Sequence, residues 1–221
     1  LDTPGHVDFC AEMERTLQVL DYAILVISGT DGIQGHTLTL WQLLRQHRVP
    51  TFLFINKMDL SGADHDALLA DLQAQLSDGC IDFCAPVEEI AEALAMTDEF
   101  LLEQYLAGNA PDDAQIQASI ACRSVFPCYF GSALSLAGVD SLLEGLTRFT
   151  KSPCYPEPFG ARVFKISRDE QGTRLTHLKI TGGSLSVRAM VSGTTQNQAW
   201  QEKVHQIRIY SGTRFQTTDC A

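Results

Sequence analysis

Three short apolar runs, separated by helical patterns, constrain the fold of this chain more than any other feature. The runs are Tyr22–Ser28, Thr51–Ile55 and Phe126–Phe130. Such short apolar segments are typical of strands covered on both faces of a parallel sheet. Apolar residues at helical spacing predict helices over Val7–Leu20, His36–His47, Asp64–Leu76, Val87–Leu106 and Val139–Phe149. We expect Asp64 to cap the third helix, because its side chain can accept bonds from first-turn N–H groups. Alternating strands and helices predict an α/β fold with a parallel sheet.

The pattern changes after Thr150. Residues 151–158 contain three prolines, which is typical of a stiff linker. Strand-like segments follow at Ala161–Ser167, Thr173–Thr181, Ser184–Val191 and Glu202–Tyr210, with a turn at Gly182-Gly183. We therefore predict an α/β domain over residues 1–153, a linker over 154–160, and a partial antiparallel β-barrel over 161–221.

The charge and hydropathy of the chain exclude several classes of partner. The 221 residues include 27 acidic and 16 basic side chains, so the formal net charge is −11. An acidic chain lacks the general electrostatic attraction that binds nucleic acid, and we expect no DNA partner. No apolar run reaches the roughly 18 residues of a membrane helix, so we expect no membrane partner. Any RNA contact would go through a local patch or through parts not present in this sequence. One strip of basic residues is either such a patch or ordinary surface charge: Arg162, Lys165, Arg168 and Lys179.

The cysteines indicate the compartment. There are seven, an odd number, and their spacing does not match a zinc site. We expect reduced thiols in a cytoplasmic protein, and a monomer.

The chain opens on Asp2-Thr3-Pro4-Gly5-His6. In a phosphate site, the carboxylate of Asp2 can hold Mg²⁺, usually through water. The glycine lets a backbone N–H approach a phosphate closely, and His6 can orient an attacking water. The same residues also fit a tight strand-to-helix turn in which Asp2 or Thr3 caps the helix.

A second motif, Asn56-Lys57-Met58-Asp59, directly follows the apolar run Thr51–Ile55. An aspartate there can accept hydrogen bonds from the guanine N1–H and exocyclic amine. The asparagine can read the guanine edge and tether neighbouring loops, and the lysine stem can pack along the base. Adenine would leave the aspartate unpaired, so this motif selects guanine. The alternative is an ordinary polar loop after a strand.

A third motif, Gly131-Ser132-Ala133-Leu134, follows the run Phe126–Phe130. Here a backbone N–H can contact the guanine carbonyl oxygen. Each of the three motifs is placed at the carboxyl end of a predicted strand, the edge where open α/β sheets bind ligands.

In this order, the three motifs resemble the third, fourth and fifth signature elements of the translation-factor GTPases. The histidine after Asp-Thr-Pro-Gly is typical of that branch, whereas Ras-like proteins usually carry glutamine there. Within the branch, the sequence is similar to elongation factor G and most similar to the tetracycline ribosomal protection proteins. The stretches similar to elongation factor G are Val7–Phe9, Glu14-Arg15, Val19–Asp21, Asp31–Gln34 and Ser61–Asp64. Those that favour the protection proteins are Ala23–Ser28, Phe54–Lys57, Phe126-Pro127 with Gly131–Ala133, and Val163–Ile166.

The resemblance implies a P-loop GTPase-type parallel sheet, truncated at its N-terminus, followed by part of the second β-barrel domain of these factors. It implies GTP or GDP and Mg²⁺ as ligands. It also implies the ribosome as partner of the full-length parent, through small-subunit RNA and the factor-binding site. Asp2 would hold Mg²⁺ through water, and His6 would position the water that attacks GTP. The nucleotide would be bound by Asp2, Thr3, Pro4, Gly5, His6, Asn56, Lys57, Met58, Asp59, Ser132, Ala133 and Leu134.

One departure from the family pattern affects activity. The 221 residues contain no Gly-x-x-x-x-Gly-Lys-[Ser/Thr] loop, which cradles the phosphates in such enzymes. Each charge-assisted bond to a phosphate contributes about 1.5–3 kcal/mol. We therefore expect this chain alone to bind guanine nucleotides weakly and to hydrolyse none, with GTPase activity in a longer parent. The alternative is a non-catalytic remnant or ribosome-binding module.

Overall fold

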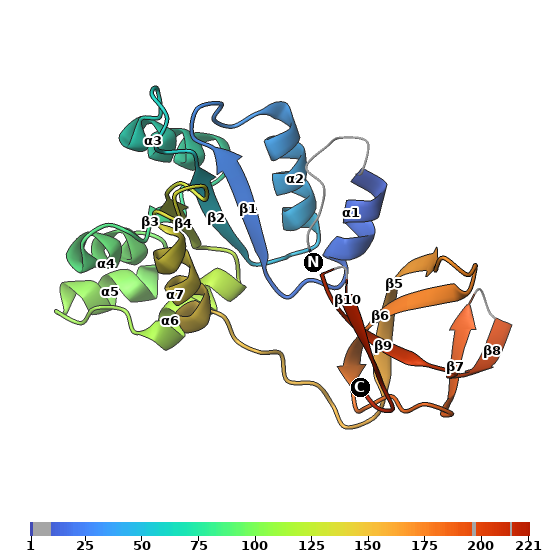
Figure 1. Ribbon diagram of the computed structural model, residues 1–221. Helices are drawn as coiled ribbons and strands as arrows, with labels where there is room; N and C mark the ends of the chain where they lie inside the picture. Colours follow the sequence, from blue (N-terminus) through green and yellow to red (C-terminus); the bar gives the residue numbers. More distant parts are fainter. Residues whose placement is uncertain (2–9, 196–197, 213) are drawn as a thin grey trace. The chain divides into compact units, whose positions relative to one another are not determined.

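The computed structural model describes residue 1 and residues 10–195, 198–212 and 214–221. The chain divides into two compact units, Leu1–Ser152 and Pro153–Ala221 (Figure 1). The first unit has both helices and strands, and the elements described in the second unit are all strands.

A parallel sheet forms the core of the first unit, with strand order β1-β2-β4-β3. The predicted strands are confirmed, and β3 is an additional short strand that the sequence did not indicate. The central strand β2 is inaccessible to solvent at Phe52, Leu53 and Ile55, as expected for a strand covered on both faces. The bounds are β1 (Ala23–Ser28), β2 (Thr51–Asn56), β3 (Cys80–Asp82) and β4 (Phe126–Phe130).

Alternate side chains of β2 point into two different cores. Leu53 and Ile55 pack with residues of α2 (Gly35–Gln46) and α3 (His65–Gln75). Phe52 and Phe54 pack with residues of three helices on the opposite face of the sheet (Figure 1). These helices are α4 (Val87–Ala95), α6 (Asp113–Ala121) and α7 (Val139–Phe149). Packing on both faces fixes the strand, and therefore the position of the loop that follows it.

The helices largely follow the predicted patterns. Asp64 caps α3 as predicted, because its carboxylate accepts from the amides of Asp66 and Ala67, both at 3.1 Å. The prediction of a single helix over residues 87–106 is wrong. This segment is divided into α4 and α5 (Glu99–Leu106), because the Asp98 side chain accepts from Phe100 N and starts a new helix. Helix α6 was not predicted. Of the first predicted helix, α1 (Cys10–Leu17) lies within the described residues.

The described residues of the second unit form three antiparallel strand pairs, which agrees with the β-rich domain predicted from the sequence. Two predicted strands are wrong in their bounds. The strand predicted over residues 184–191 begins only at Met190, after Arg188 adopts a positive φ of 71°. The strand predicted over residues 202–210 is interrupted by residues 204–206, and the last strand was not predicted. The pairs are β5 (Gly160–Arg168) with β6 (Arg174–Gly182), β7 (Met190–Thr195) with β8 (Gln198–Lys203), and β9 (Ile207–Ser211) with β10 (Arg214–Thr218).

No helix in the described part of the chain combines the length and the apolar character needed to cross a membrane.

Gly145 provides a test of the packing between α7 and the sheet. A Cβ at this position would meet the ring and hydroxyl of Tyr129, which is only 2% exposed. Alanine favours a helix interior over glycine by about 0.5–1 kcal/mol, but overpacking costs about 1–3 kcal/mol. We expect Gly145→Ala to lower the free energy of unfolding in urea by about 0.5–2 kcal/mol. The control is Gly35→Ala, whose Cβ would meet no atom within 4 Å. Equal losses in both variants would contradict this account.

Asp169 provides a test of the turn between β5 and β6. Its carboxylate accepts from the amides of Thr173 at 2.9 Å and Gln171 at 3.1 Å, and from Arg208 at 3.2 Å. The bond from Thr173, with that of Arg208, lowers the pKa of this carboxyl. The resulting stability is complete above the unfolded-state pKa, about 3.9, and is lost as pH falls through the lowered folded-state value. We expect Asp169→Asn to reduce the thermal midpoint by a few degrees at pH 7 and by less at pH 3. An equal reduction at both pH values would show that the charge is unimportant.

Candidate functional site

The four strands of the first unit end at the same edge of the sheet. Ser28, Asn56, Asp82 and Phe130 are the last residues of β1, β2, β3 and β4. Because the strands are parallel, all four loops that follow begin at this edge. This is the edge at which open α/β sheets bind ligands.

The side chain of Asn56 joins two of these loops. Its Oδ1 accepts from the backbone amide of Lys57 and from that of Ala133, both at 2.8 Å. The backbone oxygen of Asn56 also accepts from the amide of Gly29 at 2.7 Å. One residue at the end of β2 therefore holds the loops that follow β1, β2 and β4.

Backbone bonds complete the connection between the loops after β2 and β4. Met58 N donates to Gly131 O at 3.0 Å, and Gly131 N donates to Ile55 O at 2.9 Å. Within the loop after β4, Ser132 N donates to Ala137 O at 2.9 Å. Gly131 has no room for a side chain, because a Cβ would collide with the backbone carbonyl of Ala137. The loop therefore requires glycine at this position.

The residues of the second motif differ in backbone conformation and in exposure to solvent. Lys57 adopts a positive φ of 66°, which is uncommon for a residue with a side chain. Such strain is found where the surroundings hold a functional residue in place. Lys57 and Asp59 are exposed, whereas Met58 is half-buried against the core on the α2 and α3 side. Within the described part of the chain, the Asp59 carboxylate has no hydrogen-bond or ion-pair partner.

The third motif contains one buried polar group without a partner among the described residues. Ser132 is 2% exposed, and its buried hydroxyl has no hydrogen-bond partner among the described residues. An unpaired buried hydroxyl is costly, and it indicates a place where a ligand or water is accepted. Leu134 is 94% exposed at the tip of the loop. The free Asp59 carboxylate and the unpaired Ser132 hydroxyl both fit a polar ligand at this edge.

The first predicted motif cannot be compared with these loops. Asp2, Thr3, Pro4, Gly5 and His6 all lie outside the residues that the structure describes. Among the described residues, no group of three or more His, Cys, Asp or Glu side chains is placed to hold a metal ion. The structure therefore brings together the second and third motifs only.

No sequence pattern indicated a role for His65, Asp82 or Phe130 at the same edge. His65 Nε2 lies 3.0 Å from Asp82 Oδ2, and its ring packs on that of Phe130. The strand that carries Asp82 has three residues, too few for a periodic pattern. Cys84 follows nearby, and burial raises the pKa of its thiol.

Comparisons with known proteins agree with this geometry. Residues 1–152 match the model of the elongation factor Tu GTP binding domain. Over 96% of its length, the chain is 32% identical to the tetracycline resistance protein TetP of Clostridium perfringens, and it covers 36% of that relative. Over 86% of its length, it is 34% identical to TetM from transposon Tn916 of Enterococcus faecalis, and it covers 33% of that relative.

The chain thus spans about a third of the length of these curated relatives. A solved structure of ttk003000868 from Thermus thermophilus superposes on the whole chain with a TM-score of 0.82. At 23% identity and 40% coverage of that structure, the likeness concerns the fold. The match of the GTP-binding model to residues 1–152 decides the assignment: the chain belongs to the family of the elongation factor Tu GTP binding domain.

Proposed function

We propose that the joined loops after β2 and β4 bind the guanine base of GTP and GDP. The observation that supports this most is the carboxamide of Asn56, whose Oδ1 accepts from both loops at 2.8 Å. That connection places the free Asp59 carboxylate and the loop of Ser132, Ala133 and Leu134 on one rigid frame. A rigid frame matters because recognition of a planar base requires donors and acceptors at fixed separations.

The proposed chemistry distinguishes guanine from adenine. The Asp59 carboxylate accepts from the guanine N1–H and exocyclic amine, while a backbone N–H of the loop at residues 132–134 donates to the guanine carbonyl. The aliphatic stem of Lys57 packs along the base. Adenine has no N1–H and presents its amine where guanine has its carbonyl oxygen. Adenine would therefore leave both the carboxylate and the N–H unpaired, and such mismatches cause strong discrimination.

We further propose that this unit serves a ribosome-associated translational GTPase. Membership in the GTP-binding family and similarity to tetracycline resistance proteins over most of this chain support that role. The whole protein would hydrolyse GTP on the ribosome in the cytoplasm, in tetracycline protection or in an elongation factor G-like step. The second unit, Pro153–Ala221, would face small-subunit RNA.

We assign the metal site and the positioning of the attacking water to residues of the first motif. Mg²⁺ neutralises negative charge on the phosphate oxygens in sites of this class. Asp2 would hold it through water, and His6 would orient the attacking water. Both residues lie outside the described part of the chain.

Guanine recognition by Asp59 is tested with the purified 221-residue chain. We expect amide NMR titration to show weak binding of GDP and at least about tenfold weaker binding of ADP, because the carboxylate bonds only to guanine. Asp59→Asn turns an acceptor-only group into one that also donates, and removes its charge. We expect this variant to bind GDP about tenfold more weakly, at the level of ADP.

The matched control is Asp78→Asn, which makes the same charge change on an exposed residue before β3, at the opposite edge of the sheet. We expect it to bind GDP as the wild type does. Equal affinities of the wild-type chain for GDP and ADP would refute the proposed base recognition.

A further inference from the structure

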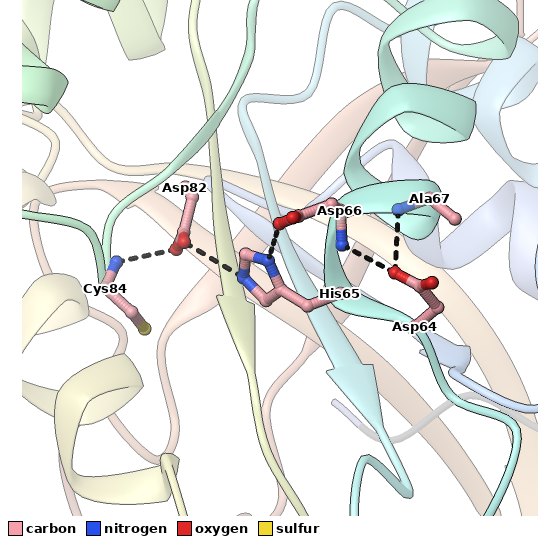
Figure 2. Close-up of polar contacts among 6 residues, drawn as sticks. All are labelled: Asp64, His65, Asp66, Ala67, Asp82 and Cys84. Carbon is pink, nitrogen blue, oxygen red and sulfur yellow. Dashed lines mark hydrogen bonds and ion pairs between the residues drawn. The ribbon is translucent and has the colours of Figure 1, made fainter.

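His65 connects three elements at the edge where the proposed nucleotide site lies. It is the first residue of α3, directly after the capping residue Asp64 (Figure 2). Its Nε2 lies 3.0 Å from Asp82 Oδ2, and its Nδ1 lies 3.0 Å from Asp66 Oδ1. Its ring packs on Phe130 with the ring centroids 4.1 Å apart and the planes at 47°. One side chain therefore links the start of α3 to the ends of β3 and β4.

Asp82 fixes the orientation of this ring. Its side chain is 11% exposed, and its Oδ1 accepts from the amide of Cys84 at 2.8 Å. The other carboxylate oxygen faces His65, as Figure 2 shows. A mostly buried carboxylate needs such partners, because an unpaired charge is strongly disfavoured away from water. By contrast, Asp66 is 98% exposed, and its contact with His65 contributes little.

Phe130 connects His65 to the loop at residues 131–134. It is the last residue of β4 and directly precedes Gly131. Two residues farther along, the amide of Ala133 donates to Asn56 Oδ1. The ring of His65 lies against the side chain of Phe130, which also packs against the core on the α2 and α3 face. A change at His65 thus acts three residues from the backbone N–H that joins the two loops.

We propose that His65 is a positioning residue for the base-reading loop at residues 131–134. Held by Asp82 and packed on Phe130, it sets where the loop leaves β4 and therefore how well Ala133 N–H meets Asn56. It touches no reacting group. This inference rests on the proposed guanine site for its functional consequence, but the placement of the loop is measurable without nucleotide.

The first test is made on the nucleotide-free chain. We expect His65→Ala to shift the amide NMR signal of Ala133 and to speed its hydrogen exchange by about tenfold, because the Asn56 bond loses its support. His65→Phe keeps a ring against Phe130, and we expect it to restore most of the wild-type signal. Asp66→Asn, which alters only the exposed contact, is the matched control and leaves the signal unchanged.

The second test measures nucleotide affinity of the same variants. We expect His65→Ala to weaken GDP binding about threefold to tenfold, without an effect on ADP, and His65→Phe to recover most of the loss. Asp82→Asn, which loses the charge but keeps an oxygen for Cys84 N, should weaken GDP binding less than His65→Ala.

The outcomes separate the two proposals. An unchanged Ala133 signal and exchange rate in a folded His65→Ala variant overturn the role of His65. If the His65→Ala variant does not fold, the Ala133 amide signal is measured in Asp82→Asn instead. A shift of that signal supports the positioning role of His65, and an unchanged signal overturns it. A wild-type chain without preference for GDP refutes the guanine site, while a shifted Ala133 signal would still support the positioning role.

Discussion

The candidate site depends on one side chain, the carboxamide of Asn56. A single oxygen accepts two amide hydrogen bonds, one from its own loop and one from the loop after β4. An asparagine oxygen has two lone pairs, so both bonds can be good at once. Replacing this side chain would leave the amide of Ala133 without this partner, and the backbone bonds of Gly131 with Met58 and Ile55 would remain. The base recognition that we propose for Asp59 requires that these loops are joined first.

The frame is held in turn by the packing of the sheet. Phe52, Leu53 and Ile55 of β2 are inaccessible to solvent, and they pack alternately into two cores. Most residues of the loops after β2 and β4 are exposed, as residues of loops on a rigid scaffold commonly are. The chain offers little attraction for phosphates: its net charge is −11, and Lys57 is the only lysine or arginine within residues 56–66 or 131–138. Strong phosphate binding at this edge therefore needs groups beyond these loops.

Much of this fold could be predicted from the sequence where the signal is local. The elements that were missed or given wrong bounds depend on short segments or on contacts between distant residues. Strands β1, β2 and β4 are apolar and end in polar motifs, and Asp64 marks the start of α3, so their signals are local and strong. Strand β3 has three residues, too few for periodicity, and the break between α4 and α5 depends on the cap formed by Asp98. The sequence predicted that Asn56 would tether neighbouring loops, without indicating which ones. The contacts of His65 with Asp82 and Phe130 were not, because they join residues up to 65 positions apart that only the fold brings together.

The most direct test of the central claim is an amide NMR map of the 221-residue chain with and without GDP. If the two joined loops read the guanine base, the largest shifts fall at residues 56–60 and 131–136, and the amide of Ala133 is among them. Shifts confined to the second unit, or spread evenly over the acidic surface, would contradict the assignment of this edge as the guanine site.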